Sequence, residues 1–297
     1  MQGVEHSREA NGWEAIRSRW PNREFSTFVY AGGIQWHLQR AGAGPVMLLV
    51  HGTGASTHSW RAFIPRLAAH FDVICPDLPG HGFTDPMSPK DTSIGGFARA
   101  LNELLRDIGA KVDYAMGHSA GAVVSCKLAL DRLITPREII SINGAFYPPF
   151  GSVGRMAAPL VRRLAGSPLV SRTLARHVEA STSRVTRLVA GTGSHIDAEG
   201  VELYAQLAKM PRHVLGVTRM LAGWDLVSFA HELPHLQARL ALLVGEADRM
   251  VPATEADRVQ RQVTHATVHR LPGLGHLAHE EAPGTILDWI FNRYARS

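Results

Sequence analysis

Short hydrophobic runs alternate with longer amphipathic segments over most of the chain. The runs are bounded by turn residues, as expected of strands buried in a sheet, and they fall at 46–50, 73–75, 114–116, 138–142 and 240–244. Segments with helical periodicity separate the early runs, at 60–70, 94–108 and 120–133. This alternation predicts an α/β fold with a mostly parallel central sheet flanked by helices.

Two departures from the alternation divide the chain. Segments 25–30 and 34–39 flank a pair of glycines and predict an antiparallel hairpin at one edge of the sheet. Between 146 and 229 the pattern is helical, which predicts a cap inserted between two strands. A last strand at 267–271 and a helix at 282–294 complete the pattern. The expected division is a core over 24–145 and 230–297, a helical cap over 146–229 and an N-terminal extension over 1–23.

The segment Gly117-His118-Ser119-Ala120-Gly121 lies between a short strand and a helix-forming run. A sharp strand-to-helix turn that exposes a serine needs small neighbours, because a larger side chain would crowd the adjacent strand and helix. The pattern makes Ser119 a candidate nucleophile. The alternative is a glycine-rich turn with an incidental serine.

A second glycine-rich segment, His51-Gly52-Thr53-Gly54, follows the strand at 46–50. Such a loop lets a backbone N–H face a nucleophile. We therefore expect the N–H groups of Thr53 and Ala120 to form an oxyanion hole, which stabilises charge that develops in a tetrahedral intermediate. An ordinary tight turn is the alternative for this loop.

Candidates for an acid and a base lie near the end of the chain. Asp248 follows the strand at 240–244, at the sheet edge where α/β proteins build their sites, and Glu246 and Asp257 compete with it. His276 lies in a glycine-rich loop after the last strand, with His279 three residues beyond. We take Asp248 as the acid and His276 as the base.

The order of these residues along the chain is itself informative. Ser119, Asp248 and His276 follow the order of α/β hydrolases, which differs from the orders in two unrelated protease families. A neutral imidazole accepts the serine proton, and a buried carboxylate holds that imidazole in the required tautomer. The three residues thus predict a Ser-His-Asp triad.

The chain resembles the α/β-hydrolase superfamily over nearly its whole length, including the segment DLPGHGFT at 77–84. It is most similar to one branch, the magnesium-chelatase accessory hydrolases of bacteriochlorophyll biosynthesis. The motifs behind this resemblance are WPNRE at 20–24, HGTGASTHSWR at 51–61, GHSAGA from 117, INGA at 142–145, GTGS at 191–194 and LPGLGHLAHEE at 271–281. This resemblance implies that the protein acts in the pathway that inserts magnesium into protoporphyrin. It implies a particular substrate less firmly.

The superfamily's triad carries over onto Ser119, Asp248 and His276. Some related enzymes take the acid from the strand before the cap, but that strand here ends in Asn143, which cannot supply an anion. Dehalogenases and epoxide hydrolases of this fold place aspartate at the strand-to-helix turn where this chain has Ser119. The serine therefore disfavours both classes. Hydrolases of carbon–carbon bonds and cofactor-free peroxidases keep serine and remain open.

The favoured interpretation is a serine hydrolase of an ester or thioester with a small, apolar substrate and no cofactor. The alternative is a non-catalytic porphyrin-binding or chelatase-assisting protein on the same fold, because a fold does not fix a function.

Composition and residue spacing exclude several other kinds of protein and site. Cys75 and Cys126 lie in hydrophobic runs and are expected to be reduced and buried. The histidines lack metal-ligand spacing, so no metal site is expected. The sequence contains no basic cluster with interleaved aromatic residues, so nucleic-acid binding is not expected either. No stretch approaches the ~20 apolar residues that span a bilayer, and we expect a cytoplasmic protein.

The positive charge is concentrated in the cap. The whole chain has a formal net charge of +5, and segment 146–229 alone holds ten basic and five acidic residues. Its first part mixes arginines, including Arg162 and Arg163, with apolar residues such as Leu160 and Leu164. This mixture suits contact with an anionic bilayer or with porphyrin carboxylates, whereas solvated arginines over a packed core are the simpler interpretation.

Overall fold

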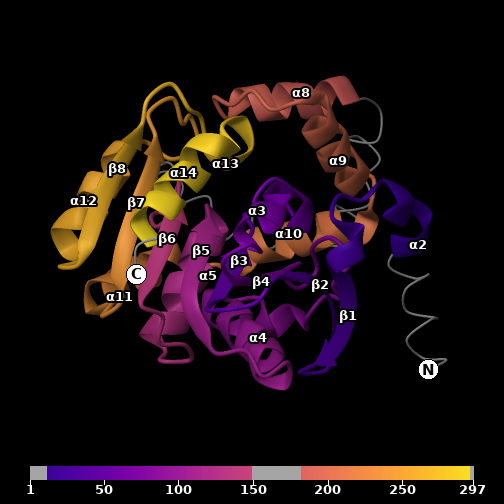
Figure 1. Ribbon diagram of the computed structural model, residues 1–297, viewed down its shortest axis with the longest axis horizontal. Coiled ribbons are helices and arrows are strands. Elements are labelled where there is room, and N and C mark those ends of the chain that lie inside the picture. Colours follow the sequence, from indigo (N-terminus) through magenta and orange to yellow (C-terminus); the bar gives the residue numbers. More distant parts are fainter. Residues whose placement is uncertain (1–11, 149–181, 295–297) are drawn as a thin grey trace.

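The computed structural model describes residues 12–148 and 182–294. In Figure 1 the strands form one twisted sheet with helices on both sides. The eight strands lie in the order β1-β2-β4-β3-β5-β6-β7-β8. Their bounds are Ser26–Ala31 for β1, Ile34–Ala41 for β2, Val46–Val50 for β3, Asp72–Pro76 for β4, Val112–His118 for β5, Glu138–Ile142 for β6, Arg239–Gly245 for β7 and Ala266–Leu271 for β8.

Strand direction follows the predicted pattern. β1 pairs with β2 and β2 with β4 in antiparallel fashion, and every other neighbouring pair is parallel. The predicted α/β fold with a mostly parallel sheet and an edge hairpin is therefore confirmed. Parallel strands in such a sheet are buried on both faces, which is why their sequences are continuous hydrophobic runs.

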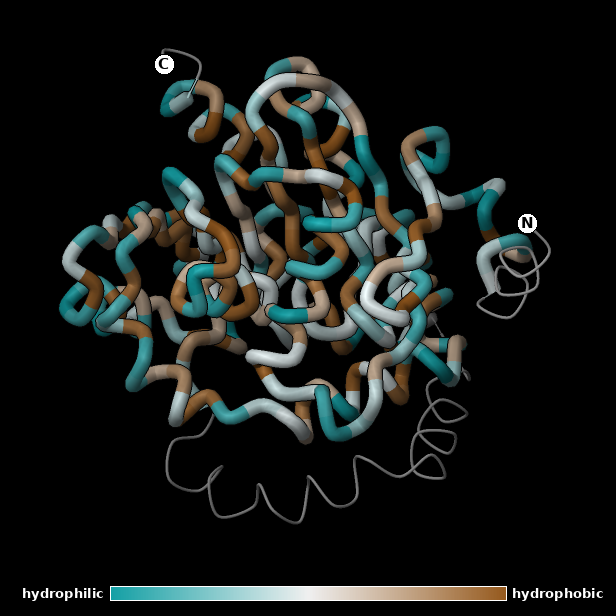
Figure 2. Tube along the Cα trace, turned by 90° about the horizontal axis from the view of Figure 1, so that it is seen from below, coloured by the Kyte–Doolittle hydropathy of each residue, from teal (hydrophilic) through white to brown (hydrophobic). Residues whose placement is uncertain are grey.

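Two hydrophobic layers cover the two faces of the sheet. One contains residues of α4 (Ile94–Asp107), α5 (Ala120–Leu130) and α12 (Thr254–Gln262), and the other contains residues of α3 (Ile64–Leu67) and α14 (Pro283–Tyr294). Figure 2 shows hydrophobic positions concentrated in the central strands, with hydrophilic ones in the outer turns. Cys75 and Cys126 lie in these layers as free, buried thiols.

The helix expected at 60–70 is shorter than its pattern indicated. A 3-10 turn, η3 (Thr57–Trp60), precedes α3 (Ile64–Leu67), and no single helix joins them. Pro65 lies where a continuous helix would need an N–H to bond the Arg61 carbonyl, and proline has none. That carbonyl instead accepts a hydrogen bond from Asn22 Nδ2 at 2.9 Å.

The segment between β6 and β7 is helical wherever it is described. Its helices are α8 (Thr182–Gly191), α9 (Ala198–Ala208), α10 (Pro211–Gly223) and α11 (Leu226–Glu232). In Figure 1, α8 and α9 lie at the top of the molecule, near the short helix α13 (Ala278–Glu281). The arginine-rich stretch with Arg162 and Arg163 lies outside the described residues. No helix in the described ranges is long and apolar enough to cross a membrane.

The N-terminal extension packs on both the sheet and the cap. α2 (Trp13–Ile16) precedes two 3-10 turns, η1 (Arg17–Arg19) and η2 (Arg23–Phe25). Trp13 and Trp20 form a small core with Phe83 and with Leu203 and Leu207 of α9. The remaining turns are η4 (Pro89–Asp91) and η5 (Leu233–His235).

Candidate active site

Ser119 occupies a strained turn between β5 and α5. Its φ is 51° and its ψ is −116°, a backbone conformation that non-glycine residues rarely adopt. A Cβ on Gly117 would lie 2.4 Å from Ala122 N, and one on Gly121 would lie 2.0 Å from Val50 O. The backbones at this turn therefore approach closely enough to require glycine on both sides of the serine.

The structure brings the three predicted triad residues together. His276 Nε2 lies 3.1 Å from Ser119 Oγ, and His276 Nδ1 lies 2.7 Å from Asp248 Oδ2. The Asp248 side chain is fully buried, and its Oδ1 accepts the backbone N–H groups of Met250 and Val251. One carboxylate oxygen is thus anchored by its own loop while the other faces the imidazole.

The two competing acids lie elsewhere. Glu246 is exposed. Asp257 forms an ion pair with Arg270 at 2.7 Å. Among the three candidate carboxylates, Asp248 is the one in contact with His276.

Asn143, considered in the sequence only as an unsuitable acid, holds the loop that carries His276. Its Nδ2 donates to the carbonyl oxygens of Gly275 and His276, both at 2.9 Å, and its Oδ1 accepts the Gly245 N–H at 2.7 Å. His118 Nε2 also lies 2.9 Å from the His276 carbonyl oxygen. The position of Asn143, directly after β6 and beside β7, is the signal that could have identified this role.

The GTGS segment of the cap lies between the acid loop and the base loop. The Thr192 carbonyl accepts N–H groups from Arg249 at 3.1 Å and His276 at 3.3 Å. Ser194 Oγ accepts the Leu277 N–H at 2.8 Å. A Cβ on Gly193 would lie 2.1 Å from the Ala247 carbonyl oxygen. This part of the cap therefore contacts the backbone on both sides of the Asp248–His276 pair.

The glycine-rich loop after β3 lies against the nucleophile. A Cβ on Gly52 would be 3.2 Å from Ser119 Cβ and 2.7 Å from His118 Nδ1. Thr53 Oγ1 donates to Met220 Sδ of α10 at 3.3 Å. The loop is close enough to Ser119 for its backbone to contribute to a site there, while the oxyanion roles of the Thr53 and Ala120 N–H groups remain a prediction.

Two further buried histidines, His118 and His279, lie next to His276. The rings of His118 and His279 are 4.3 Å apart, and the rings of His118 and His276 are 4.9 Å apart. Burial lowers the pKa of His118 well below its usual value and that of His279 to about 3, so both rings are neutral near neutral pH. Within the two described ranges, no group of three histidine, cysteine or acidic side chains is arranged to hold a metal ion.

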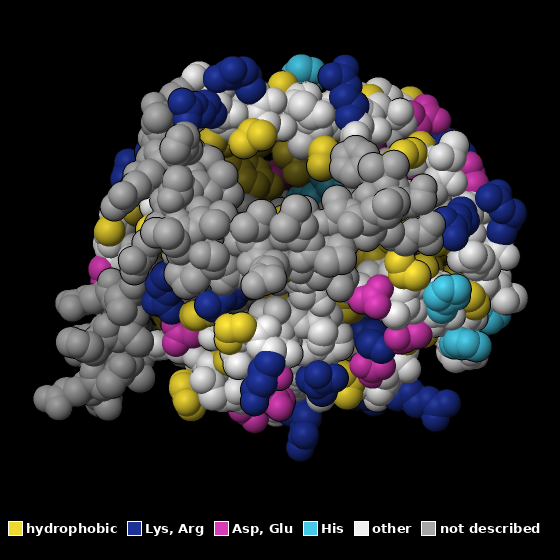
Figure 3. Space-filling model, turned by 180° about the vertical axis from the view of Figure 1, so that it is seen from behind, with side chains coloured by type: hydrophobic (Ala, Val, Ile, Leu, Met, Phe, Trp, Pro, Cys, Tyr) yellow, Lys and Arg dark blue, Asp and Glu magenta, His cyan; other side chains and the backbone are white. Residues whose placement is uncertain are grey.

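An ionic network centred on the buried Glu280 side chain joins the cap to the helix after His276. Glu280 of α13 accepts hydrogen bonds from Arg61 and from the Tyr204 hydroxyl, both at 2.7 Å, and Arg61 also bonds Asp197 at 2.8 Å. Burial raises the pKa of Glu280 to about 7 despite these partners. Figure 3, which views the molecule from behind, shows a hollow with hydrophobic and histidine side chains inside it.

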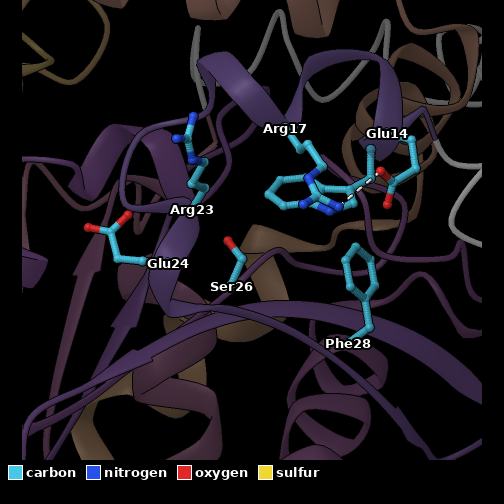
Figure 4. Close-up of a pocket in the computed structure, with 7 residues that line it drawn as sticks. Glu14, Arg17, Arg23, Glu24, Ser26 and Phe28 are labelled. Atoms are coloured by element: carbon cyan, nitrogen blue, oxygen red, sulfur yellow. Dashed lines mark hydrogen bonds and ion pairs between the residues drawn. The ribbon is translucent and has the colours of Figure 1, made fainter.

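A separate cavity of about 320 Å³ lies at the N-terminal extension. Trp13 and Phe28 form its apolar wall, and Arg17 pairs with Glu14 at its edge (Figure 4). None of the residues that line it belongs to the Ser119 site.

Comparisons with known proteins identify the family to which this chain belongs. A family model described as "Alpha/beta hydrolase family" matches residues 47–289. The chain is 37% identical over 282 residues to the magnesium-chelatase 30 kDa subunit of Rhodobacter capsulatus, covering 93% of this chain and 98% of that protein.

Solved structures share the fold at lower identity. The epoxide hydrolase CorEH superposes with a TM-score of 0.76 at 19% identity, covering 91% of this chain and 98% of that one. A thermophilic esterase from Thermogutta terrifontis gives a TM-score of 0.70 at 23% identity with the same coverages. The predicted membership is confirmed: this chain belongs to the α/β hydrolase family.

Proposed function

We propose that this protein is a serine hydrolase of an ester or thioester. Ser119 is the nucleophile, His276 the base, and Asp248 the acid that orients it. The observation that carries the proposal is the continuous chain of contacts from Ser119 Oγ through the His276 ring to the buried Asp248 carboxylate. A carboxylate at Nδ1 keeps the proton on that nitrogen and leaves Nε2 free to accept one.

The reaction follows from these positions. As Ser119 Oγ attacks the acyl carbon, its proton passes to His276 Nε2, and negative charge develops on the acyl oxygen. The N–H groups of Thr53 and Ala120 stabilise that oxyanion. The imidazolium then protonates the leaving group, which gives an acyl-enzyme. Water activated by the same imidazole releases the acid and regenerates Ser119.

Hydrolysis of a short-chain aryl ester tests this proposal. Ser119→Ala is expected to abolish turnover while the thermal unfolding midpoint stays nearly unchanged, because the triad acts as a unit on chemistry. Ser88→Ala is a matched control, since Ser88 is exposed and lies outside the site. Equal turnover by Ser119→Ala and the wild type would refute the assignment.

The similarity to the magnesium-chelatase 30 kDa subunit favours a second candidate, a non-catalytic protein that binds porphyrin or assists the chelatase. Under this candidate the wild type is inert to acyl substrates, and both it and Ser119→Ala bind protoporphyrin equally. Quenching of tryptophan fluorescence by protoporphyrin measures that binding. Ester turnover that depends on Ser119 would exclude a purely non-catalytic role.

We further propose a cytoplasmic location with peripheral contact to an anionic membrane. Arg184, Arg187 and Leu188 of α8 are all exposed, which continues the basic and apolar mixture of the cap into the described residues. Sedimentation with anionic but not neutral vesicles at low salt is expected, with weaker binding by Arg184→Glu/Arg187→Glu. Equal binding to both vesicle types would exclude an electrostatic contact.

A further inference from the structure

One buried histidine of the cap touches two loops of the core. His213 of α10 is 3% exposed, its Nδ1 lies 3.0 Å from the Gly82 N–H nitrogen, and its Nε2 lies 3.2 Å from the Gly54 carbonyl oxygen. A backbone N–H can only donate, so Nδ1 carries the lone pair. In the neutral ring the proton is then on Nε2, which donates to Gly54.

A second buried histidine fixes the other end of the same loop. The Leu78 N–H donates to His51 Nε2 at 2.9 Å, so the proton of this ring is on Nδ1. That Nδ1 donates to the Gly52 carbonyl at 2.8 Å. The Ala55 N–H donates to the same carbonyl at 3.2 Å. Thr53 therefore lies between two glycine carbonyls that are each held by an imidazole of defined tautomer.

Holding these carbonyls also aims the N–H of Thr53. The Gly52 carbonyl and the Thr53 N–H belong to one planar peptide unit, and in a trans peptide they point in opposite directions. No peptide bond in the described ranges is cis. Rotation of this unit would break the bond from His51, and rotation of the unit that follows Gly54 would break the bond from His213.

This inference rests on the proposed function. We propose that His213 is a positioning residue supplied by the cap, which, together with His51, holds the Gly52–Gly54 loop so that the Thr53 N–H faces the oxyanion. Catalysis therefore depends on how α10 packs on the core as well as on the triad.

Helix α10 packs closely enough on the core to serve this role. A Cβ on Gly216 would lie 2.0 Å from the Gly80 carbonyl oxygen, so the helix packs directly on the backbone of a core loop. Met220, two turns after His213, receives the hydrogen bond from Thr53 Oγ1. Burial lowers the pKa of His213 to about 4, and the titratable groups that interact with it include His51, His58, His81 and Asp77. The ring thus stays neutral and keeps its tautomer near neutral pH.

Two substitutions separate the two hydrogen bonds of His213. A glutamine amide reaches the position of Nε2 and can still donate to Gly54, whereas an asparagine amide reaches only the position of Nδ1 and can still accept from Gly82. We expect His213→Asn to lower kcat about 10- to 100-fold with little change in KM, since a misaligned oxyanion donor weakens transition-state binding. His213→Gln should recover most of that loss. His231→Asn, at an exposed position of α11, is the matched control.

The rate of Ser119 phosphonylation by a fluorophosphonate and side-chain ¹⁵N spectra of histidine complete the test. Slower labelling of His213→Asn than of His213→Gln is expected, and the spectra should show His213 protonated on Nε2. Wild-type kcat in His213→Asn, equal losses in both variants, or a ring protonated on Nδ1 would each overturn the inference. A wild type that shows the Nε2 tautomer but neither labels nor turns over ester would refute the proposed function and the positioning role with it.

Discussion

Ser119 Oγ and His276 Nε2 lie 3.1 Å apart although 157 residues separate them in the chain. Ser119 follows β5 and His276 follows β8, and two strands, β6 and β7, lie between these in the sheet. The base loop must therefore cross the ends of both intervening strands. It lies directly on the end of β7, because a Cβ on Gly245 would be 2.5 Å from the Gly275 carbonyl oxygen. The same carbonyl accepts a hydrogen bond from Asn143, the residue that follows β6.

Asn143, directly after β6, should be essential to this crossing. Asn143→Asp keeps an acceptor for the Gly245 N–H but replaces the amide donor with an oxygen that opposes two carbonyls. We expect kcat to fall at least ~100-fold and stability to fall by about 1–3 kcal/mol, the cost of buried polar groups left without partners. Ester kinetics and denaturant unfolding measure both. Wild-type kinetics would show that Asn143 does not hold the base loop.

Asp248→Asn should lower kcat by about 10²- to 10⁴-fold, because an amide no longer fixes the tautomer of His276. Glu246→Gln is the matched control, since Glu246 follows the same strand but is exposed. It should retain wild-type kcat. The reverse result, with the larger loss in Glu246→Gln, would move the acid role to that residue.

The glycines that flank the Ser119 turn, Gly117 and Gly121, should tolerate no side chain. Gly121→Ala places a methyl group against the Val50 carbonyl and should cost more than ~3 kcal/mol of unfolding free energy, with loss of activity. Gly284→Ala meets no atom within 4 Å in helix α14 and should stabilise the protein by roughly 0.5 kcal/mol. Chemical unfolding compares the two. A well-folded, active Gly121→Ala would contradict the close packing at the Ser119 turn.

The strands were predictable because burial on both faces leaves a simple signal. The runs at 46–50 and 138–142 match β3 and β6 residue for residue. The helix at 60–70 was wrong in length because periodicity does not register the missing N–H of Pro65. The positions of Ser119, Asp248 and His276 followed from local motifs and chain order. The contacts of Asn143 and His213 did not. Asn143 was weighed only as a candidate acid, although its place directly after β6 puts it at the sheet edge where the site is built. For His213, nothing in the spacing of 16 histidines shows which ones meet across the fold.

Stability should fall as the pH is lowered from about 6.5 to 4. Burial lowers the pKa of several histidines, so the unfolded chain binds protons in this window that the folded chain does not, and each histidine contributes up to ~1.4 kcal/mol per pH unit. They are His51, His58, His81, His118, His213 and His279. Glu255 and Glu280, whose pKa values burial raises to about 7, act in the opposite direction but are fewer.

Denaturant unfolding at pH 7, 6 and 5 measures this dependence. His213→Gln should show a shallower slope than the wild type, whereas His231→Asn should keep the wild-type slope because its side chain is exposed. A free energy of unfolding that rises toward pH 5 would mean that these six buried histidines are not held neutral in the folded protein.

The most direct test of the serine-hydrolase proposal is mass spectrometry of the protein after reaction with a fluorophosphonate. The account predicts one adduct on the peptide that contains Ser119, slower labelling of Asp248→Asn and none in Ser119→Ala. An unlabelled wild type, or an adduct that persists in Ser119→Ala, would contradict it.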